Sequence, residues 1–130
     1  MHEMYTEIIL DYYRNPKNFG RLENPDAAAR DLNPLCGDEI EMNMKFDKSI
    51  VKDVRFAGKG CAISQAAASM LTELVKGKSI DDASKISQDD VLKLLQIPIS
   101  AARRKCAMLG LKVFKIALYG YRGKKYSAEL

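Results

Sequence analysis

The chain has only three cysteines and one histidine in 130 residues. An odd cysteine count excludes a complete framework of internal disulfides, and it argues for cytosolic thiol or metal chemistry rather than a secreted, disulfide-stapled fold. The cysteines, Cys36, Cys61 and Cys106, are separated by 24 and 44 residues, which matches no standard zinc-finger spacing. The single histidine, His2, lies at the terminus, and we do not expect it to bind a metal.

The sequence also lacks long apolar runs. None approaches the roughly 18 residues of a membrane span, and the start of the chain has neither the basic nor the apolar region of a signal peptide. No internal repeat or low-complexity segment is present, and 130 residues is the length of one ordinary domain. We therefore expect a single domain over residues 1–130, a cytoplasmic location and no membrane partner.

Acidic residues are scarce near the end of the chain. Residues 101–130 carry eight lysines or arginines and one acid, a charge of +7, so that the net charge of +4 leaves −3 for residues 1–100. A basic segment of this kind binds nucleic acid or an acidic protein, or is simply solvated. Because few aromatic residues lie among the basic ones and no recognised binding motif is present, we do not expect nucleic acid as a partner.

Alternating apolar and polar residues predict a small antiparallel sheet. Residues 40–46 alternate cleanly, and residues 51–57 repeat the pattern less cleanly after a turn at 47–49. A further short strand is expected near residues 28–32. The two clear strands should form a hairpin, which brings the residues that enter it and leave it to the same end.

Apolar residues at helical spacing predict helices around this sheet. One begins near Tyr5 and ends at residues 15–16, and a second runs from Cys61 to Gly77. Ser79 and Ser87 resemble helix N-caps, and a last helix is expected over about residues 100–119. The apolar face of this last helix is assigned to Cys106, Leu109, Val113, Ile116 and Ala117. The predicted class is α+β, with a small antiparallel sheet of about three strands and helices packed on one side.

The three cysteines lie at element ends, among glycines or basic residues. Cys61 follows Gly-Lys-Gly at 58–60 and begins a helix, where the helix dipole and Lys59 favour thiolate over thiol. The basic residues 103–105 would act in the same way on Cys106. Thiolates are soft ligands for zinc and iron–sulfur clusters, and they are also nucleophiles that accept sulfur. Each cysteine alone could equally be an inert core residue.

Three local motifs resemble one known family. They are PLCGD at 34–38, FAGKGCAIS at 56–64 and the Lys-Cys pair at 105–106 early in a helix. Together with LVKGKS at 74–79 and residues 5–19, they are similar to the U-type iron–sulfur scaffold family of IscU, SufU and the N-terminal domain of NifU. The motifs occur in the family's order, and the resemblance covers nearly the whole chain.

The resemblance implies a SufE/NifU-like fold and a non-enzymatic scaffold function. A cysteine desulfurase would deliver persulfide sulfur, iron would be added, and a [2Fe–2S] cluster would be built for transfer to recipient apo-proteins. Cys36, Cys61 and Cys106 would bind the cluster, or zinc in its absence, and one or more would accept sulfur. Asp38 would be a labile oxygen ligand that eases release. Supporting positions are Gly37, Lys59, Gly60, Arg103 and Lys105.

Two other functions predict the same ligands. One is a zinc-dependent sulfurtransferase of the SufU kind, in which zinc holds the thiolates and one of them leaves the metal to accept persulfide sulfur. The other is a structural zinc that only joins loops. The sequence does not separate these from the scaffold function.

The chain departs from both branches of the family that it resembles. Lys105 stands where the IscU branch carries a histidine, which leaves Asp38 as the natural fourth ligand. The LPPVK chaperone motif is missing, and IPIS at 97–100 resembles it only faintly, which argues against a dedicated Hsp70-type chaperone. The SufU branch shares the arginine at Arg103 but carries a longer insertion between its second and third cysteines, which this chain lacks.

Overall fold

A three-stranded antiparallel sheet is covered on one face by helices. The computed structural model describes residues 6–34 and 37–123. The strands β1 (Ala27–Asn33), β2 (Asp38–Asp47) and β3 (Ile50–Lys59) lie in the order β1-β2-β3. The described helices are α1 (Glu7–Arg14), α2 (Ala62–Val75), α3 (Ile80–Ser84), α4 (Gln88–Leu95) and α5 (Ala101–Tyr121). The predicted α+β class is confirmed.

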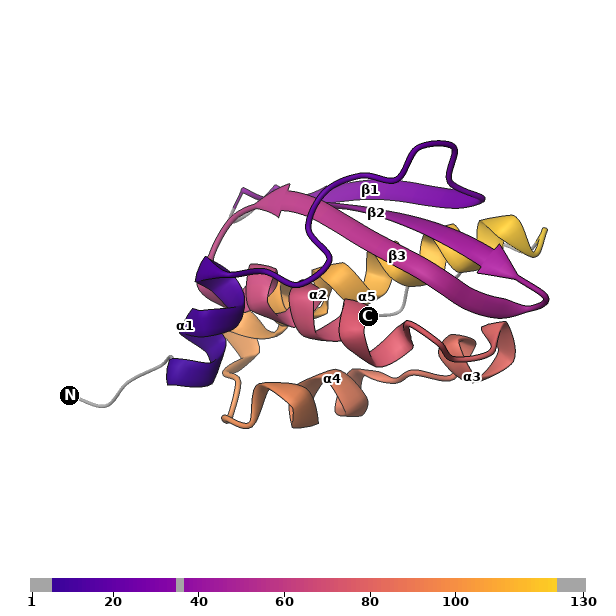
Figure 1. Ribbon diagram of the computed structural model, residues 1–130. Helices are drawn as coiled ribbons and strands as arrows, with labels where there is room; N and C mark the ends of the chain where they lie inside the picture. Colours follow the sequence, from indigo (N-terminus) through magenta and orange to yellow (C-terminus); the bar gives the residue numbers. More distant parts are fainter. Residues whose placement is uncertain (1–5, 35–36, 124–130) are drawn as a thin grey trace.

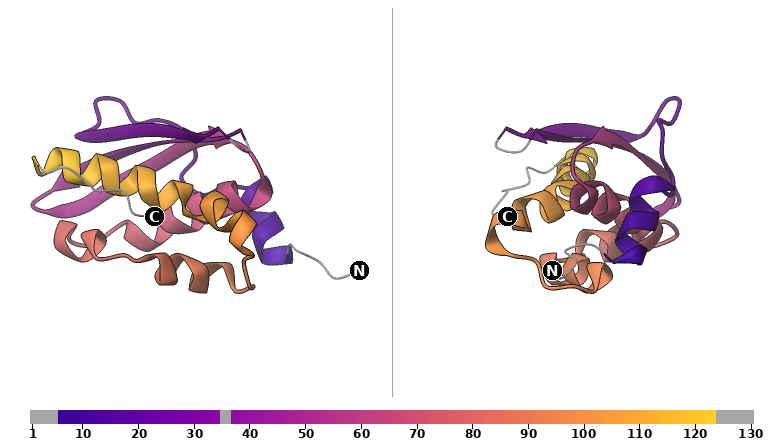
Figure 2. Two further views of the ribbon diagram at one scale, coloured as in Figure 1. Left: turned by 180° about the vertical axis from the view of Figure 1, so that it is seen from behind. Right: turned by 90° about the vertical axis from the view of Figure 1, so that its left-hand side faces the viewer.

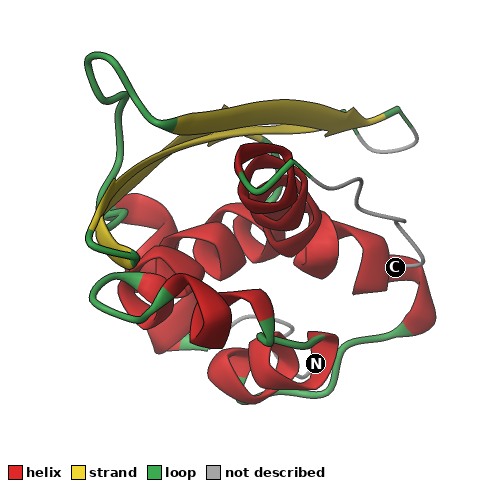
Figure 3. Ribbon diagram, turned by 90° about the vertical axis from the view of Figure 1, so that its right-hand side faces the viewer, coloured by secondary structure: helices red, strands yellow, loops and turns green. Residues whose placement is uncertain are grey.

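The two long helices, α2 and α5, form the layer directly beneath the sheet (Figure 1). Helix α5 contacts β1 and β2, α2 contacts β3, and α1 and α4 pack on these helices rather than on the sheet (Figure 2). The other face of the sheet has no described helix on it (Figure 3). None of the described helices is long and apolar enough to span a membrane.

Alternation along β2 fixes which residues form the core. Ile40, Met42 and Met44 are fully buried beneath the sheet, because side chains two residues apart in a strand point to the same face. The strand near residues 28–32 is the seven-residue β1, which pairs antiparallel with β2 from Ala27 opposite Met44 to Asn33 opposite Asp38.

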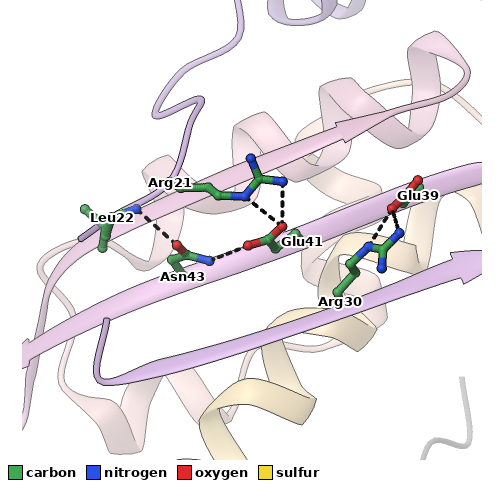
Figure 4. Close-up of polar contacts among 6 residues, drawn as sticks. All are labelled: Arg21, Leu22, Arg30, Glu39, Glu41 and Asn43. Carbon is green, nitrogen blue, oxygen red and sulfur yellow. Dashed lines mark hydrogen bonds and ion pairs between the residues drawn. The ribbon is translucent and has the colours of Figure 1, made fainter. Parts of the chain in front are cut away.

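The uncovered face of the sheet carries a solvated polar network. Arg21 pairs with Glu41 and Arg30 with Glu39, and the Asn43 side chain donates a hydrogen bond to Glu41 (Figure 4). The Arg21 guanidinium lowers the pKa of the Glu41 carboxyl. Exposed pairs of this kind each contribute at most about 1 kcal/mol, so this face is polar surface rather than core.

The predicted apolar face of the last helix is wrong at one position. Ile116 is 36% exposed, whereas the neighbouring Lys115 is buried and donates a hydrogen bond from Nζ to the Ser84 carbonyl oxygen at 2.7 Å. Burial lowers the pKa of Lys115. A long lysine stem can lie along apolar surface while its ammonium reaches a polar partner. Because the prediction ranked residues by polarity, it assigned Ile116 to the core in place of Lys115. The other four predicted core residues of this helix are buried.

Most basic side chains of α5 bond to neighbouring elements. Arg104 donates hydrogen bonds to the Gln88 side chain, Lys112 pairs with Asp31 at 2.8 Å, and Arg122 pairs with Asp81 at 3.0 Å. These contacts join α5 to α4, β1 and α3. Part of the positive charge that the sequence places in this segment therefore stabilises the fold.

The backbones of α2 and α5 approach each other closely at Gly110. A Cβ atom on Gly110 would lie 3.2 Å from both Cα and Cβ of Ala68 and 3.6 Å from the Met42 methyl carbon. The two distances to Ala68 are shorter than ordinary van der Waals contact, whereas the distance to Met42 is normal. The two helices can adopt this spacing because residue 110 has no side chain.

Replacing Gly110 by valine should destabilise the protein. Overpacking of a close helix contact costs about 1–3 kcal/mol, and we expect a decrease of this size in the free energy of unfolding measured with urea. Gly120→Val on the same helix is the control, because no atom lies within 4 Å of a Cβ there. Equal stabilities for the two variants would contradict the close approach.

Candidate metal centre

Asp38, Cys61 and Cys106 converge at one end of the sheet. Their ligand atoms all lie within 4.8 Å of one another. Asp38 is the first residue of β2, Cys61 is the N-cap of α2, and Cys106 lies in the second turn of α5. Because Glu39 of β2 pairs with Lys59 of β3, the hairpin brings its entry and exit together, as the alternating strands predicted.

The Asp38 carboxylate is bound to the backbone and side chain of Cys61. Asp38 is 1% exposed, and its Oδ1 accepts a hydrogen bond from the Cys61 backbone N–H at 2.9 Å. Its Oδ2 faces the Cys61 thiol, with Sγ donating at 3.7 Å. One oxygen is therefore held by the backbone, and the other lies beside the sulfur.

Gly60 makes room for this carboxylate. A Cβ atom on Gly60 would lie 2.1 Å from Asp38 Oδ1 and 2.8 Å from its Cγ, which is sterically impossible. Gly60 also has a positive φ of 148°, a conformation that glycine adopts without strain. Gly37 has a φ of 76°, but nothing lies within 4 Å of a Cβ there. Of these two predicted supporting glycines, Gly60 is the one whose missing side chain shapes the centre.

The Cys61 sulfur lies in the N-terminal turn of α2. Its Sγ accepts a hydrogen bond from the Ser64 backbone N–H at 3.4 Å, and the Ser64 hydroxyl donates to the Cys61 carbonyl oxygen at 3.1 Å. The Gln65 side chain in turn donates to the Ser64 hydroxyl at 3.0 Å. The helix start predicted at Cys61 is confirmed. The sulfur is therefore held in place by the first turn of the helix.

Sequence reasoning gave no role to Ser64 and Gln65. Both are buried polar residues on the first turn of α2. The role of Ser64 could have been predicted from its spacing of three residues from Cys61. An N-cap side chain accepts from the backbone N–H three residues later. The hydrogen bond of Gln65 depends on its rotamer and has no such signal.

The two described thiols differ in accessibility. Cys106 is 4% exposed, whereas Cys61 is only partly buried. A reagent from solvent therefore reaches Cys61 more readily than Cys106.

Three of the residues discussed from sequence lie outside the described part of the chain. They are Cys36, the first predicted ligand, His2, which we did not expect to bind a metal, and Tyr5, near which the first helix was expected to begin. Gly37 and Asp38, which directly follow Cys36, are described, and Asp38 lies at the centre.

The predicted basic supporting residues lie within three residues of a described cysteine along the chain. Lys59 is exposed at the end of β3, and Arg103 is half-buried in the first turn of α5. Lys105 directly precedes Cys106 but is exposed. Sequential neighbours on a helix point about 100° apart, so the buried thiol and the exposed ammonium face different directions.

The donor atoms fit a thiophilic metal. Zinc binds thiolate sulfur at about 2.3 Å in tetrahedral geometry, so two sulfurs on one ion lie about 3.8 Å apart. The separations of up to 4.8 Å between the three described donors exceed this by about 1 Å. Small side-chain rotations would bring two sulfurs and one oxygen onto a common ion, which is a donor set suited to zinc or to an iron–sulfur cluster.

Comparison with known sequences gives relatives over most of the chain. Residues 4–128 match the family described as the NifU-like N-terminal domain. The zinc-dependent sulfurtransferase SufU of Bacillus subtilis is 40% identical, and the match covers 86% of this chain and 87% of that protein. The iron–sulfur cluster assembly scaffold protein IscU of Escherichia coli is 34% identical, with 93% of this chain and 96% of that protein covered.

Solved structures share the fold. A putative iron–sulfur cluster assembly scaffold protein of the SUF system from Fervidobacterium islandicum superposes with a TM-score of 0.76 at 30% identity, over 88% of this chain and 96% of that one. The N-terminal domain of a NifU-like protein from Brucella abortus gives a TM-score of 0.76 at 23% identity, covering 92% and 94%, and supports the fold alone. The chain therefore belongs to the NifU-like N-terminal domain family, which also contains SufU and IscU proteins.

Proposed function

We propose that the protein is a scaffold on which an iron–sulfur cluster is assembled. It would accept sulfur from a cysteine desulfurase, bind a [2Fe–2S] cluster and pass it to recipient apo-proteins. The observation that carries this proposal is the convergence of Asp38, Cys61 and Cys106 within 4.8 Å. Cys36, two residues before Asp38 in the sequence, is proposed as the remaining thiolate.

Cys61 is the proposed first acceptor of sulfur. It is the more exposed of the two described thiols, so a donor protein reaches it more readily than Cys106. In the transfer step, the Cys61 thiolate attacks the terminal sulfur of the donor's persulfide. The new S–S bond leaves a persulfide on Cys61, the donor's S–S bond breaks, and the donor cysteine departs as a thiolate.

Asp38 is proposed to ease the release of the cluster from the centre. A hard carboxylate oxygen binds a soft metal less firmly than a thiolate does. Asp38 Oδ1 accepts from the Cys61 N–H, and Oδ2 lies 3.7 Å from the Cys61 sulfur. Oδ2 is therefore the oxygen proposed to bind the metal beside that sulfur. A centre with one weak ligand has one position where a recipient's thiolate can enter first.

A zinc-dependent sulfurtransferase is the alternative function, and the 40% identity to Bacillus subtilis SufU favours it. In this case zinc would hold the same thiolates, and one of them would leave the metal to accept sulfur. The two functions share their ligands and differ in what the protein binds when it is isolated.

Anaerobic purification should separate the two functions. For a scaffold, we expect coloured protein with iron and sulfide in equal amounts, and Cys106→Ser should lose both, because it removes a buried soft ligand. Ala102→Ser, an exposed change on the same helix, is the control and should keep them. Colourless protein with one zinc that strongly accelerates a desulfurase would instead support the transferase. If Cys106→Ser changed neither metal content nor sulfur acceptance, the proposed ligand set would be wrong.

Removing the Asp38 carboxylate should slow cluster release. We expect Asp38→Ala to transfer its cluster to an apo-ferredoxin about tenfold more slowly, since changes next to metal ligands alter binding by about 10–100-fold. Asp38→Asn is the matched variant, because its amide oxygen can still accept from the Cys61 N–H. If the negative charge matters for release, Asp38→Asn should resemble Asp38→Ala. Wild-type transfer rates in both variants would rule out the weak-ligand role.

Adding a single methyl group at Gly60 should weaken metal binding. The new Cβ would displace the Asp38 carboxylate, and we expect the zinc affinity of Gly60→Ala to fall by about 10–100-fold in a chelator competition assay. Gly37→Ala is the control, because it strains a positive φ without meeting any atom within 4 Å. An equal loss in both variants would show that backbone strain, and not the carboxylate, is responsible.

A further inference from the structure

A groove lies next to the candidate centre, between the end of β1 and the first half of α5. Its volume is about 390 Å³, which is within the range of binding pockets. Leu32 and Pro34 line it from the β1 side, and Met108 and Leu109 line it from α5. Leu32 is 49% exposed, so part of this apolar wall faces solvent. We name it the β1–α5 groove.

The charged residues that line this groove are all basic. They are Arg104, Lys105 and Lys112, and among the described lining residues none is acidic. Lys112 is paired with Asp31. The Arg104 guanidinium donates hydrogen bonds to Gln88, and because Gln88 is neutral, this contact does not compensate the charge of Arg104.

Lys105 is the least constrained of these cations. It is exposed, and no hydrogen bond or ion pair joins it to another residue of the described ranges. The groove thus combines an apolar floor with a surplus of positive charge. A ligand with both acidic and apolar groups matches it, because complementary charge favours encounter and apolar contact provides affinity.

The groove also lies beside an open strand edge. The sheet order is β1-β2-β3, so β1 pairs with β2 on one side and with no described strand on the other. The backbone groups at such an edge can bind an extended polypeptide. The Leu32 N–H is the exception in β1, because it already donates to Asp31 Oδ1 at 2.8 Å. Such a strand would place every second side chain on the face towards α5, where the β1–α5 groove lies.

We propose that the β1–α5 groove binds an extended segment of a protein partner in which acidic and apolar residues alternate, by strand addition to β1. The acidic side chains would lie on the face towards α5 and pair with Arg104 and Lys105. The apolar ones would lie on the other face, beside Leu32, which is opposite Glu39 in the sheet. The adjoining strand edge favours a polypeptide over a small anion, because only a polypeptide can use the edge and the groove together. This interaction goes beyond the proposed assembly function.

Fluorescence anisotropy with a synthetic peptide tests the proposal. The probe is a labelled ten-residue peptide in which glutamate alternates with valine or leucine. We expect saturable binding that weakens with salt, and Lys105→Glu should weaken it by about fivefold or more. Lys52→Glu is the charge-matched control, because Lys52 is an exposed lysine on β3, two strands away, and it should bind like the wild type.

Two altered peptides test the mode of binding. A peptide with lysine in place of glutamate should not bind. A peptide with a central proline, which cannot donate a strand hydrogen bond, should bind about tenfold more weakly. Hydrogen exchange should slow in β1 when the glutamate peptide is bound. Equal binding by Lys105→Glu and Lys52→Glu, or unchanged exchange in β1, would overturn the proposal.

The result does not depend on the metal centre. Neither Asp38 nor Cys61 lines the groove, and Asp38→Ala should bind the peptide like the wild type. A loss of peptide binding in Asp38→Ala equal to that in Lys105→Glu would contradict a separate groove. If the protein binds neither a cluster nor zinc but binds the peptide normally, the proposed function is wrong and the groove proposal is supported.

Discussion

The hydrogen bond between the Cys61 backbone N–H and the Asp38 carboxylate is the contact on which the centre depends. It joins the first residue of β2 to the residue that begins α2, at the point where β3 has just ended. Burying a carboxylate is costly unless its oxygens find donors, and this N–H supplies one at 2.9 Å. The bond can form only because Gly60 has no side chain in the space that the carboxylate fills. The Asp38–Cys61 hydrogen bond and the space left by Gly60 thus link the start of β2, the start of α2 and the position of a candidate ligand.

The third described candidate ligand is positioned by α5, which packs beside α2 beneath the sheet. Cys106 and Gly110 are four residues apart on α5, so they lie on the same face of the helix. Gly110 lies close to Ala68 of α2, and Cys61 is the N-cap of α2. The short distance between the helices therefore holds Cys106 near Cys61. A wider spacing would separate the two sulfurs even with the hairpin intact.

Much of this arrangement follows from sequence patterns with strong physical causes. The alternation around Ile40 and the turn after it predict an antiparallel hairpin, and this alone brings Asp38 near Cys61. The burial of Lys115 in place of Ile116 was not predictable, because helical periodicity ranks residues by polarity and ignores where a long stem can reach. The hydrogen bond from Gln65 to Ser64 depends on a rotamer. The ligand roles of Asp38, Cys61 and Cys106 stay predictions, as does that of Cys36, which lies outside the described residues.

One turn of α5 connects the candidate centre with the surface proposed to bind a partner. Cys106 faces the buried side of this turn, and the preceding Lys105 is exposed and lines the β1–α5 groove. A partner segment that pairs with Lys105 would contact the outer side of the turn whose inner side carries Cys106. Neither Cys106 nor the other described candidate ligands line the groove. The proposed partner and the candidate metal centre therefore use different side chains of one helical turn.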